Sequence, residues 1–268
     1  MSALARSLRD HWPEVLIEAC GLGLFMISAG AFATLLYSPL SPLAGRLPEG
    51  LLRHSLMGLA MGSTAICLIY SPWGRRSGAH FNPSVTLTFL RLGKIAPADA
   101  LLYVGAQAAG GVLGVLVVRT LLGAAFSAPP VRSVATVPGA AGIGVAFAAE
   151  VLISALLMTA VLWISNGRFA RITGLVAGAL VALYITFEAP LSGMSMNPAR
   201  SFASALPSGI WEGFWIYLLA PPLGMLLAAE GYRAARGLGE VYCAKLHHAD
   251  DHRCIFRCRY CESPAAKS

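Results

Sequence analysis

The chain has 268 residues, of which 56% are hydrophobic and only 12% are charged. Soluble domains carry about 25% charged residues, so this composition argues against a cytosolic globular enzyme and against a disordered protein. The 28 glycines show no three-residue period, which excludes a collagen-like chain. A membrane protein with several spans remains, and the net charge of +7 has to be interpreted from where the basic residues lie.

Six stretches are long and apolar enough to cross the roughly 30 Å hydrocarbon core of a bilayer as helices. They cover residues 15–37, 54–73, 97–119, 143–165, 172–188 and 212–232. The segment before the first stretch contains Arg6 and Arg9 but no short apolar region followed by a small-residue cleavage site. We therefore expect the first span to be retained as a helix and not removed as a signal peptide.

The basic residues gather on one side of these spans. If both termini are cytoplasmic, 15 of the 20 Lys and Arg residues lie inside, and only Arg46, Arg53, Arg119, Arg132 and Arg200 lie outside. Positive charge on cytoplasmic loops is the usual determinant of orientation. The sequence thus predicts a multi-pass protein of the cell (inner or plasma) membrane with cytoplasmic termini, whose positive charge serves topology and the lipid bilayer, with no nucleic acid partner.

One short pattern occurs twice in the chain. Residues 77–83 and 192–198 both read S-G-x-x-x-N-P, and each copy follows the second span of a three-span half. A carboxylate also recurs in the first span of each half, at Glu18 and Glu150. Because each half has an odd number of spans, the halves enter the membrane from opposite sides, and such inverted repeats place a binding or conduction site near the midplane.

The segments that follow the two motifs, residues 83–90 and 198–206, are apolar but only about half as long as a span. Asn is a favoured N-cap and Pro a favoured first helical residue, so each N-P pair predicts a helix start. Non-helical backbone at membrane depth must be buried in protein or line a wet cavity. We therefore expect two re-entrant half-helices whose N-termini meet near the centre of the membrane.

This arrangement has chemical consequences for what can pass. Each half-helix directs its positive dipole end, about half an elementary charge, at the midplane. Asn82 and Asn197 can each offer amide N–H donors to the lumen. A small neutral molecule can exchange hydrogen bonds along this path, whereas a cation or a hydronium ion meets an opposing field. An isolated N-P pair is usually a turn, but two copies in the same frame of an inverted repeat favour a pore.

With the segments SGAHFNPSV (Ser77–Val85) and SGMSMNPARS (Ser192–Ser201), the chain resembles the aquaporin or major intrinsic protein family. Glu18, Gln107 and Glu150 are supporting matches within roughly residues 14–233. The resemblance implies an all-α membrane protein of six transmembrane helices plus two re-entrant half-helices, one pore per subunit, and a homotetramer. Residues 1–13 are then the cytoplasmic N-terminus, 14–233 the channel domain with halves 14–120 and 143–233, and 234–268 a cytoplasmic tail that contains Cys and His.

The same resemblance implies roles for individual residues. Asn82 and Asn197 become the central donors and Arg200 part of the outer constriction, which Ile185 and Met194 would complete. The constriction residue of the second span aligns with Met61, or with Gly62 if no residue is inserted around residues 71–76. This filter is less polar than that of strict water channels, and flexible Met side chains leave its width open.

Two further sequence features separate possible solutes. Glycerol-conducting relatives carry Asp after the motif Arg, where this chain has Ser201 as water channels do, while strict water channels carry His where this chain has Ile185. We therefore expect water to pass, with small uncharged solutes as further candidates. His80 either packs the loop or lines the pore, where it could act in pH gating.

Intramembrane carboxylates by default suggest ion or proton coupling. The resemblance instead favours a structural role for Glu18, Glu150 and Gln107, in which they hold irregular loop backbone through hydrogen bonds. Three function classes follow: a passive channel for water and small neutral solutes, a channel for neutral metalloid acids or glycerol-type solutes, and an ion-coupled transporter. The sequence contains no nucleophile–base pair or phosphate loop, so an enzyme is not expected.

The last residues of the chain lie outside the resemblance. The C-x-x-C pair of Cys258 and Cys261 has a spacing suited to zinc or another soft metal, and Cys254 or His252 could complete the site. We expect no other cofactor. The alternative is a solvated tail whose thiols are incidental and, in the cytoplasm, reduced.

Overall fold

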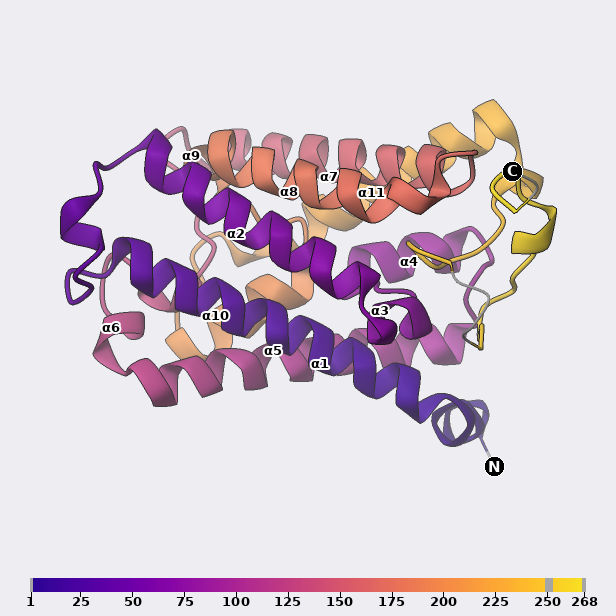
Figure 1. Cartoon of the computed structure of the whole chain (residues 1–268), viewed down its shortest axis with the longest axis horizontal. Coiled ribbons are helices and arrows are strands. Elements are labelled where there is room, and N and C mark those ends of the chain that lie inside the picture. Colours follow the sequence, from indigo (N-terminus) through magenta and orange to yellow (C-terminus); the bar gives the residue numbers. More distant parts are fainter. Residues whose placement is uncertain (1, 249–252, 267–268) are drawn as a thin grey trace.

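The computed structural model describes residues 2–248 and 253–266, and every regular element within these ranges is helical. Six helices of the described residues are long and apolar enough to span a membrane. They are α1 (Ala3–Tyr37), α2 (Leu51–Tyr70), α5 (Pro97–Leu122), α7 (Ile143–Ser165), α8 (Thr173–Phe187, extended by the turn Ala170–Ile172) and α11 (Phe214–Arg236). Figure 1 shows them lying along the long axis of the molecule. The predicted all-α membrane fold is confirmed.

The largest departure from the predicted spans is at the start of α1. Helical structure begins at Ala3 and continues through Pro13, with non-helical dihedral angles at His11 (φ −127°, ψ 16°). Pro13 cannot donate the backbone hydrogen bond of a helix interior, which accounts for a break within the preceding turn. The imidazole of His11 lies 2.7 Å from the carboxylate of Asp99 in the first turn of α5. The first residues thus form a helical extension packed against the bundle.

Two short helices form the re-entrant segments. Helix α4 (Pro83–Arg91) and helix α10 (Pro198–Ser208) each start at an Asn-Pro pair, and the side chain of the Asn accepts a hydrogen bond from the first turn of its helix. Each half-helix packs more extensively against a span of the other half than against the equivalent span of its own, α4 against α11 and α10 against α5. The two halves are therefore interlocked and share one core.

Glycines set how closely the spans approach one another. A Cβ at Gly110 of α5 would lie 2.0 Å from the carbonyl oxygen of Ala19 in α1, and one at Gly114 would lie 2.4 Å from that of Gly23. In the other half, a Cβ at Gly224 of α11 would lie 2.3 Å from the carbonyl oxygen of Val151 in α7. Small residues at such crossings allow the backbone contact that associates helices in a bilayer, where apolar burial supplies little driving force.

The chain after α11 returns to the bundle. Both termini lie at the same end in Figure 1, where the short helix α3 (Pro72–Ser77) also lies; we call this the tail end. Val241 and Ala244 are fully buried there, and Leu246 and Phe256 belong to the same apolar core as residues of α4 and α5. The alternative of a wholly solvated tail is therefore wrong, because these apolar side chains complete the core at the tail end.

The helix crossing can be tested with two substitutions in α5. Gly110→Ala places a methyl group against the backbone of α1 and should lower the free energy of unfolding by about 1–3 kcal/mol or more. Gly105→Ala is the matched control, because a Cβ there meets no described atom within 4 Å. Thermal unfolding of the detergent-purified protein measures both. Equal unfolding temperatures for the two variants would contradict the tight crossing.

Candidate pore

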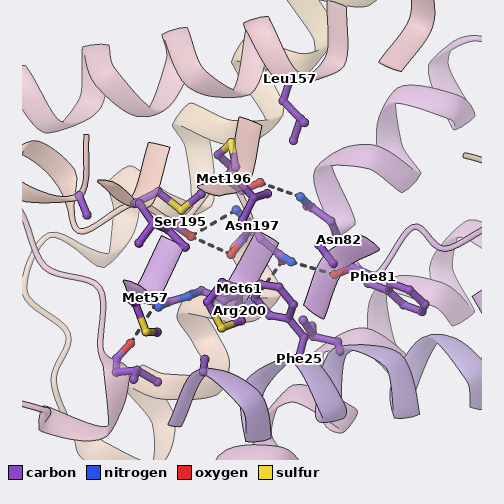
Figure 2. Close-up of a pocket in the computed structure, with 18 of the residues that line it drawn as sticks. Phe25, Met57, Met61, Phe81, Asn82, Leu157, Ser195, Met196, Asn197 and Arg200 are labelled. Atoms are coloured by element: carbon purple, nitrogen blue, oxygen red, sulfur yellow. Dashed lines mark hydrogen bonds between the residues drawn. The ribbon is translucent and has the colours of Figure 1, made fainter. Parts of the chain in front are cut away.

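The two half-helices meet through their Asn caps. The amide nitrogen of Asn82 donates to the carbonyl oxygen of Met196 at 2.7 Å, and that of Asn197 donates to the carbonyl oxygen of Phe81 at 2.8 Å (Figure 2). An Asn amide group has two N–H donors, so each Asn retains one donor beyond this reciprocal contact. The two positive helix ends are thereby held together at one level of the bundle.

The loops that lead into the half-helices have left-handed backbone at matching positions. The φ angles are 55° at Ala79 and 45° at Phe81 in the first copy, and 45° at Met194 and 53° at Met196 in the second. Such angles are uncommon for residues other than Gly and persist only where the surroundings enforce them. This backbone is also not helical, so its N–H groups need partners from elsewhere.

Two buried carboxylates supply those partners. Glu18 accepts from the backbone N–H groups of His80 and Phe81, at 3.1 and 2.6 Å, and from the hydroxyl of Ser77. In the other half, the carboxylate of Glu150 accepts from the equivalent three groups, which belong to Ser195 (2.6 Å), Met196 (2.8 Å) and Ser192 (2.8 Å). These contacts support a structural role for both carboxylates.

The two carboxylates differ in one further partner. Gln107 donates its side-chain amide to Glu18 at 2.8 Å. This contact places Gln107 beside the first loop and supports the structural role that the resemblance implies for it. The side-chain hydroxyl of Thr86 is a second acceptor for the same amide, at 3.2 Å, which ties Gln107 to α4 as well.

A second repeated contact was missed in the sequence. The hydroxyl of Tyr103 in α5 donates to the carbonyl oxygen of Ser77 at 2.8 Å, and the hydroxyl of Tyr217 in α11 donates to that of Ser192 at 2.6 Å. The two Tyr residues follow their Ser by 26 and 25 residues. That near-equal spacing within an inverted repeat is the signal that could have identified them.

A cavity of about 440 Å³ passes the Asn pair. All seven residues predicted to line the pore contribute to its wall, namely Met61, His80, Asn82, Ile185, Met194, Asn197 and Arg200. Gly62 does not line the cavity. It faces α8 instead, where a Cβ at this position would lie 2.5 Å from the carbonyl oxygen of Gly178. The alignment that places Met61 at the constriction, with a residue inserted around residues 71–76, therefore agrees with the structure, and the alignment that places Gly62 there does not. Met57, one helical turn before Met61, also lines the cavity and was not singled out from the sequence.

The side chain of Arg200 is held across the cavity by a loop between the two halves. Its guanidinium donates to the carbonyl oxygen of Val134 at 3.0 Å. Val134 ends a run of three residues with positive φ, from Arg132 to Val134 (49°, 55° and 51°). The hydroxyl of Ser201, the residue after Arg200, lies 2.6 Å from the hydroxyl of Ser195 and 2.7 Å from that of Thr136. These bonds connect the second motif to the same loop.

His80 lies beneath the chain's C-terminal segment. Its Nε2 donates to the carbonyl oxygen of Ala244 at 2.9 Å, and its ring stacks between the rings of Phe89 and Phe256. The residue is buried against the loop, and it also contributes to the wall of the cavity. The tail supplies both the acceptor and one of the aromatic rings, neither of which the sequence could have assigned.

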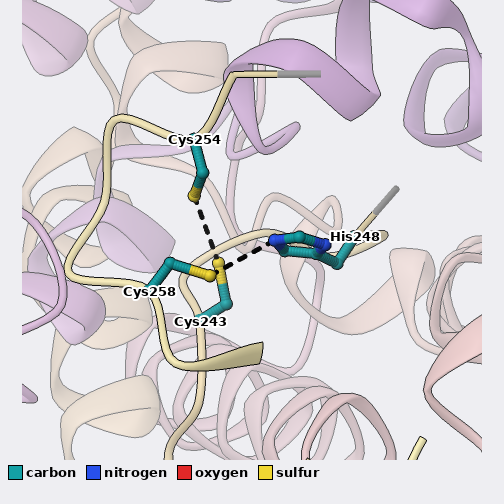
Figure 3. Close-up of side chains that lie close together, drawn as sticks. All are labelled: Cys243, His248, Cys254 and Cys258. Carbon is teal, nitrogen blue, oxygen red and sulfur yellow. Dashed lines mark hydrogen bonds between the residues drawn. The ribbon is translucent and has the colours of Figure 1, made fainter. Parts of the chain in front are cut away.

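The predicted metal ligands are only partly brought together. Cys254 and Cys258 lie close together, but their neighbours are Cys243 and His248, and the four ligand atoms lie within 4.8 Å of one another (Figure 3). Cys261 is exposed and outside this group, so its assignment is corrected, and His252 lies outside the described residues. Hydrogen bonds from the thiols of Cys243 and Cys254 hold the pKa of Cys258 well below its usual range.

A sequence model of the family described as "Major intrinsic protein" matches residues 6–232. The chain belongs to this family. It is 34% identical to Aquaporin NIP1-1 of Arabidopsis thaliana over 189 residues, which cover 68% of this chain and 63% of the relative. It is 30% identical to Aquaporin NIP1-4 of Oryza sativa subsp. japonica over 233 residues, which cover 84% and 83% of the two chains.

Similarity to a solved structure supports the fold. The fold matches the X-ray structure of the aquaglyceroporin from Plasmodium falciparum with a TM-score of 0.69 and 21% identity, covering 83% of this chain and 95% of that one. The chain spans about three fifths of the length of the first curated relatives that it matches. Members of the family are channels and not enzymes, which agrees with the lack of a catalytic arrangement in the sequence.

The role of the buried carboxylates can be tested with Glu150→Gln. The substitution keeps the size of the side chain but replaces one acceptor oxygen by an amide that faces backbone N–H groups. An unsatisfied buried donor costs about 1–3 kcal/mol, so we expect lower thermal stability and slower solute flux. Glu49→Gln, on a largely exposed side chain, is the control. Wild-type behaviour of Glu150→Gln would refute the structural role.

Proposed function

We propose that this protein is a passive transmembrane channel for water and small uncharged solutes, and that it excludes ions and protons. The observation that carries this proposal is the single cavity wall that contains both Asn caps and Arg200. Each Asn has one amide hydrogen beyond its contact with the opposite loop. A water molecule at this level can accept from these amides and exchange hydrogen bonds as it moves.

Electrostatics support the exclusion of cations. Both half-helix N-termini are positive at the level of the Asn pair, and Arg200 adds a full positive charge in the wall. Among the described residues that line the cavity there is no carboxylate. A cation or hydronium ion on this path therefore meets positive potential with no counter-charge in the wall.

The position of the carboxylates disfavours ion coupling. The oxygens of Glu18 and Glu150 accept backbone and hydroxyl hydrogen bonds, and neither residue lines the cavity. A transporter would need such a group to bind and release an ion or proton during its cycle. The hydrogen bonds that Glu18 and Glu150 already accept favour a structural role, in which neither carboxylate binds and releases an ion.

The filter supports solutes beyond water. Met61, Ile185 and Met194 line the cavity together with Arg200, so one polar group faces a largely apolar wall. Met side chains are flexible and adapt to different shapes. This chemistry suits small neutral molecules, and it leaves a channel for glycerol-type solutes or neutral metalloid acids as the second candidate.

The proposed cellular setting follows from charge and family. The excess of basic residues on one side of the spans favours cytoplasmic termini in the cell membrane. We propose a homotetramer with one pore per subunit, on the strength of the family membership. Exposed leucines on the outer faces of α1, α2, α7 and α8 provide an apolar surface for lipid or for neighbouring subunits.

The channel can be tested in proteoliposomes by stopped-flow light scattering. Incorporation of the protein should speed osmotic shrinkage without proton or cation current. Asn82→Asp and Asn197→Asp should reduce the flux to that of empty liposomes, because each places a negative charge at the Asn pair. A current driven by a pH or sodium gradient would favour a transporter, and unchanged flux in both variants would refute the role of the Asn residues.

The filter can be tested separately with Met61→Ala. Removing most of this side chain should widen the constriction, so flux of glycerol and urea should rise several-fold more than flux of water. Osmotic shrinkage measures the flux of water, and isotonic swelling measures that of glycerol, urea and a neutral metalloid acid. Leu59→Ala, an exposed position on the same helix, is the control. An unchanged ratio would place the constriction elsewhere in the cavity.

A further inference from the structure

The C-terminal segment contains a cluster of soft metal ligands that the channel does not use. Cys243, His248, Cys254 and Cys258 offer three sulfurs and one imidazole nitrogen. The Sγ atoms of Cys243 and Cys254 are 3.6 Å apart, and the Sγ of Cys258 is 3.2 Å from Nε2 of His248 (Figure 3). The four residues come from two stretches of chain, 243–248 and 254–258, that lie against each other.

These distances fit tetrahedral zinc. With Zn–S bonds of about 2.3 Å and Zn–N bonds of about 2.0–2.1 Å, a tetrahedral site places two sulfurs about 3.8 Å apart and a sulfur and a nitrogen about 3.6 Å apart. Three Cys and one His form a common set for structural zinc. A disulfide between Cys243 and Cys254 would use only two of the four groups and would leave Cys258 and His248 beside it.

The ligands alternate with residues that cover the tail end of the pore. Ala244 and Leu246 lie between the ligands Cys243 and His248, and Phe256 lies between Cys254 and Cys258. Leu246 lines the cavity, and its backbone N–H donates to the carbonyl oxygen of Gly78 at 3.1 Å. Ala244 accepts from His80, and Phe256 stacks on the His80 ring. A metal ion that holds the four ligands in place would therefore also hold Ala244, Leu246 and Phe256 in place over the tail end of the pore.

The backbone of the segment is also bound to the bundle at two points, one just before the cluster and one within it. The backbone N–H of Tyr242 donates to the side chain of Asn166 at 2.8 Å, and that of Arg257 donates to the carbonyl oxygen of Lys94 at 3.0 Å. The ammonium group of Lys245 donates to the carbonyl oxygen of Arg253, which joins the two stretches. The cluster thus lies at the junction of the tail with α4 and α7.

We propose that Cys243, His248, Cys254 and Cys258 bind one zinc ion, and that this ion holds Leu246 and Phe256 over the tail end of the pore so that the zinc-bound channel is closed. The proposal that zinc closes the channel rests on the proposed channel function, whereas the proposal that these residues bind zinc does not. Release of zinc frees the two stretches from each other, and the segment can then leave the mouth. The chain thereby carries a metal-dependent gate.

The binding part is tested on the purified full-length protein by mass spectrometry of bound metal. Wild type should bind about one zinc ion per chain, Cys258→Ser should lose it, and Cys261→Ser, an exposed thiol of the same segment, should keep it. Equal zinc in wild type and Cys258→Ser would overturn the site. So would a Cys243–Cys254 disulfide in protein without zinc, or binding of arsenite, which thiols hold without imidazole, in place of zinc.

The gate is tested by osmotic flux through proteoliposomes loaded with zinc or treated with a chelator. Chelation should raise the flux of wild type and of Cys261→Ser several-fold, and Cys258→Ser should be fast under both conditions. Leu246→Ala, which keeps all four ligands, should bind zinc and still be fast. Equal wild-type flux with and without zinc, in the presence of measurable conduction, would overturn the gate.

The two proposals fail in different ways. If neither chelated wild type nor Leu246→Ala conducts more than empty liposomes, the channel function and its gate are overturned together. The zinc content of Cys258→Ser against Cys261→Ser then still decides the metal site by itself. Amide hydrogen exchange of residues 243–248 and 254–258 gives a further readout, which should speed up on chelation only if zinc holds these stretches.

Discussion

The pore depends on the hydrogen bonds between two buried carboxylates and two loops of left-handed backbone. A helix that stops inside a bilayer leaves N–H groups with no water to bind, and each unsatisfied group costs several kcal/mol. Glu18 and Glu150 accept from these groups directly. The broken backbone can therefore persist at membrane depth, and only because it persists can two helix N-termini point at each other.

The inverted repeat uses these hydrogen bonds in both halves, but the two motifs differ at the position of His80 and Ser195. His80 and Ser195 occupy equivalent places in the two motifs, and each contacts the residue four after its Asn, Thr86 or Ser201. The small Ser195 leaves the cavity room on its side. The larger imidazole of His80 instead reaches out of the repeat to the carbonyl of Ala244. The His80 side chain is thus one of the groups that connect the channel domain to the C-terminal segment, as is that of Asn166.

Much of this architecture could be predicted from the sequence because it rests on local signals. Span lengths, the two N-P helix starts and the recurring Glu are each readable within a few residues. Contacts between residues that are far apart in the sequence were harder to predict. Nothing near Val134 indicates that its carbonyl receives Arg200, and Tyr103 and Tyr217 look like ordinary buried aromatics until their distances from Ser77 and Ser192 are compared. The prediction that Cys261 joins the Cys and His cluster was wrong, because the spacing of the residues does not reveal that Cys243 lies beside Cys254.

The loop that leads into α4 is bound by Glu18 on one side and by the tail on the other. Because these are separate groups, the tail can leave the loop and return to it. Glu18 binds the N–H groups of His80 and Phe81, whereas the tail binds the carbonyl of Gly78 and the imidazole of His80. Departure of the tail therefore removes none of the bonds between Glu18 and the loop, and it leaves the contact between Asn82 and Met196 in place. What it leaves behind are the carbonyl groups of Gly78 and Lys94 and the imidazole N–H of His80, and water can satisfy these groups. The mouth can thus open while the centre of the pore keeps its geometry.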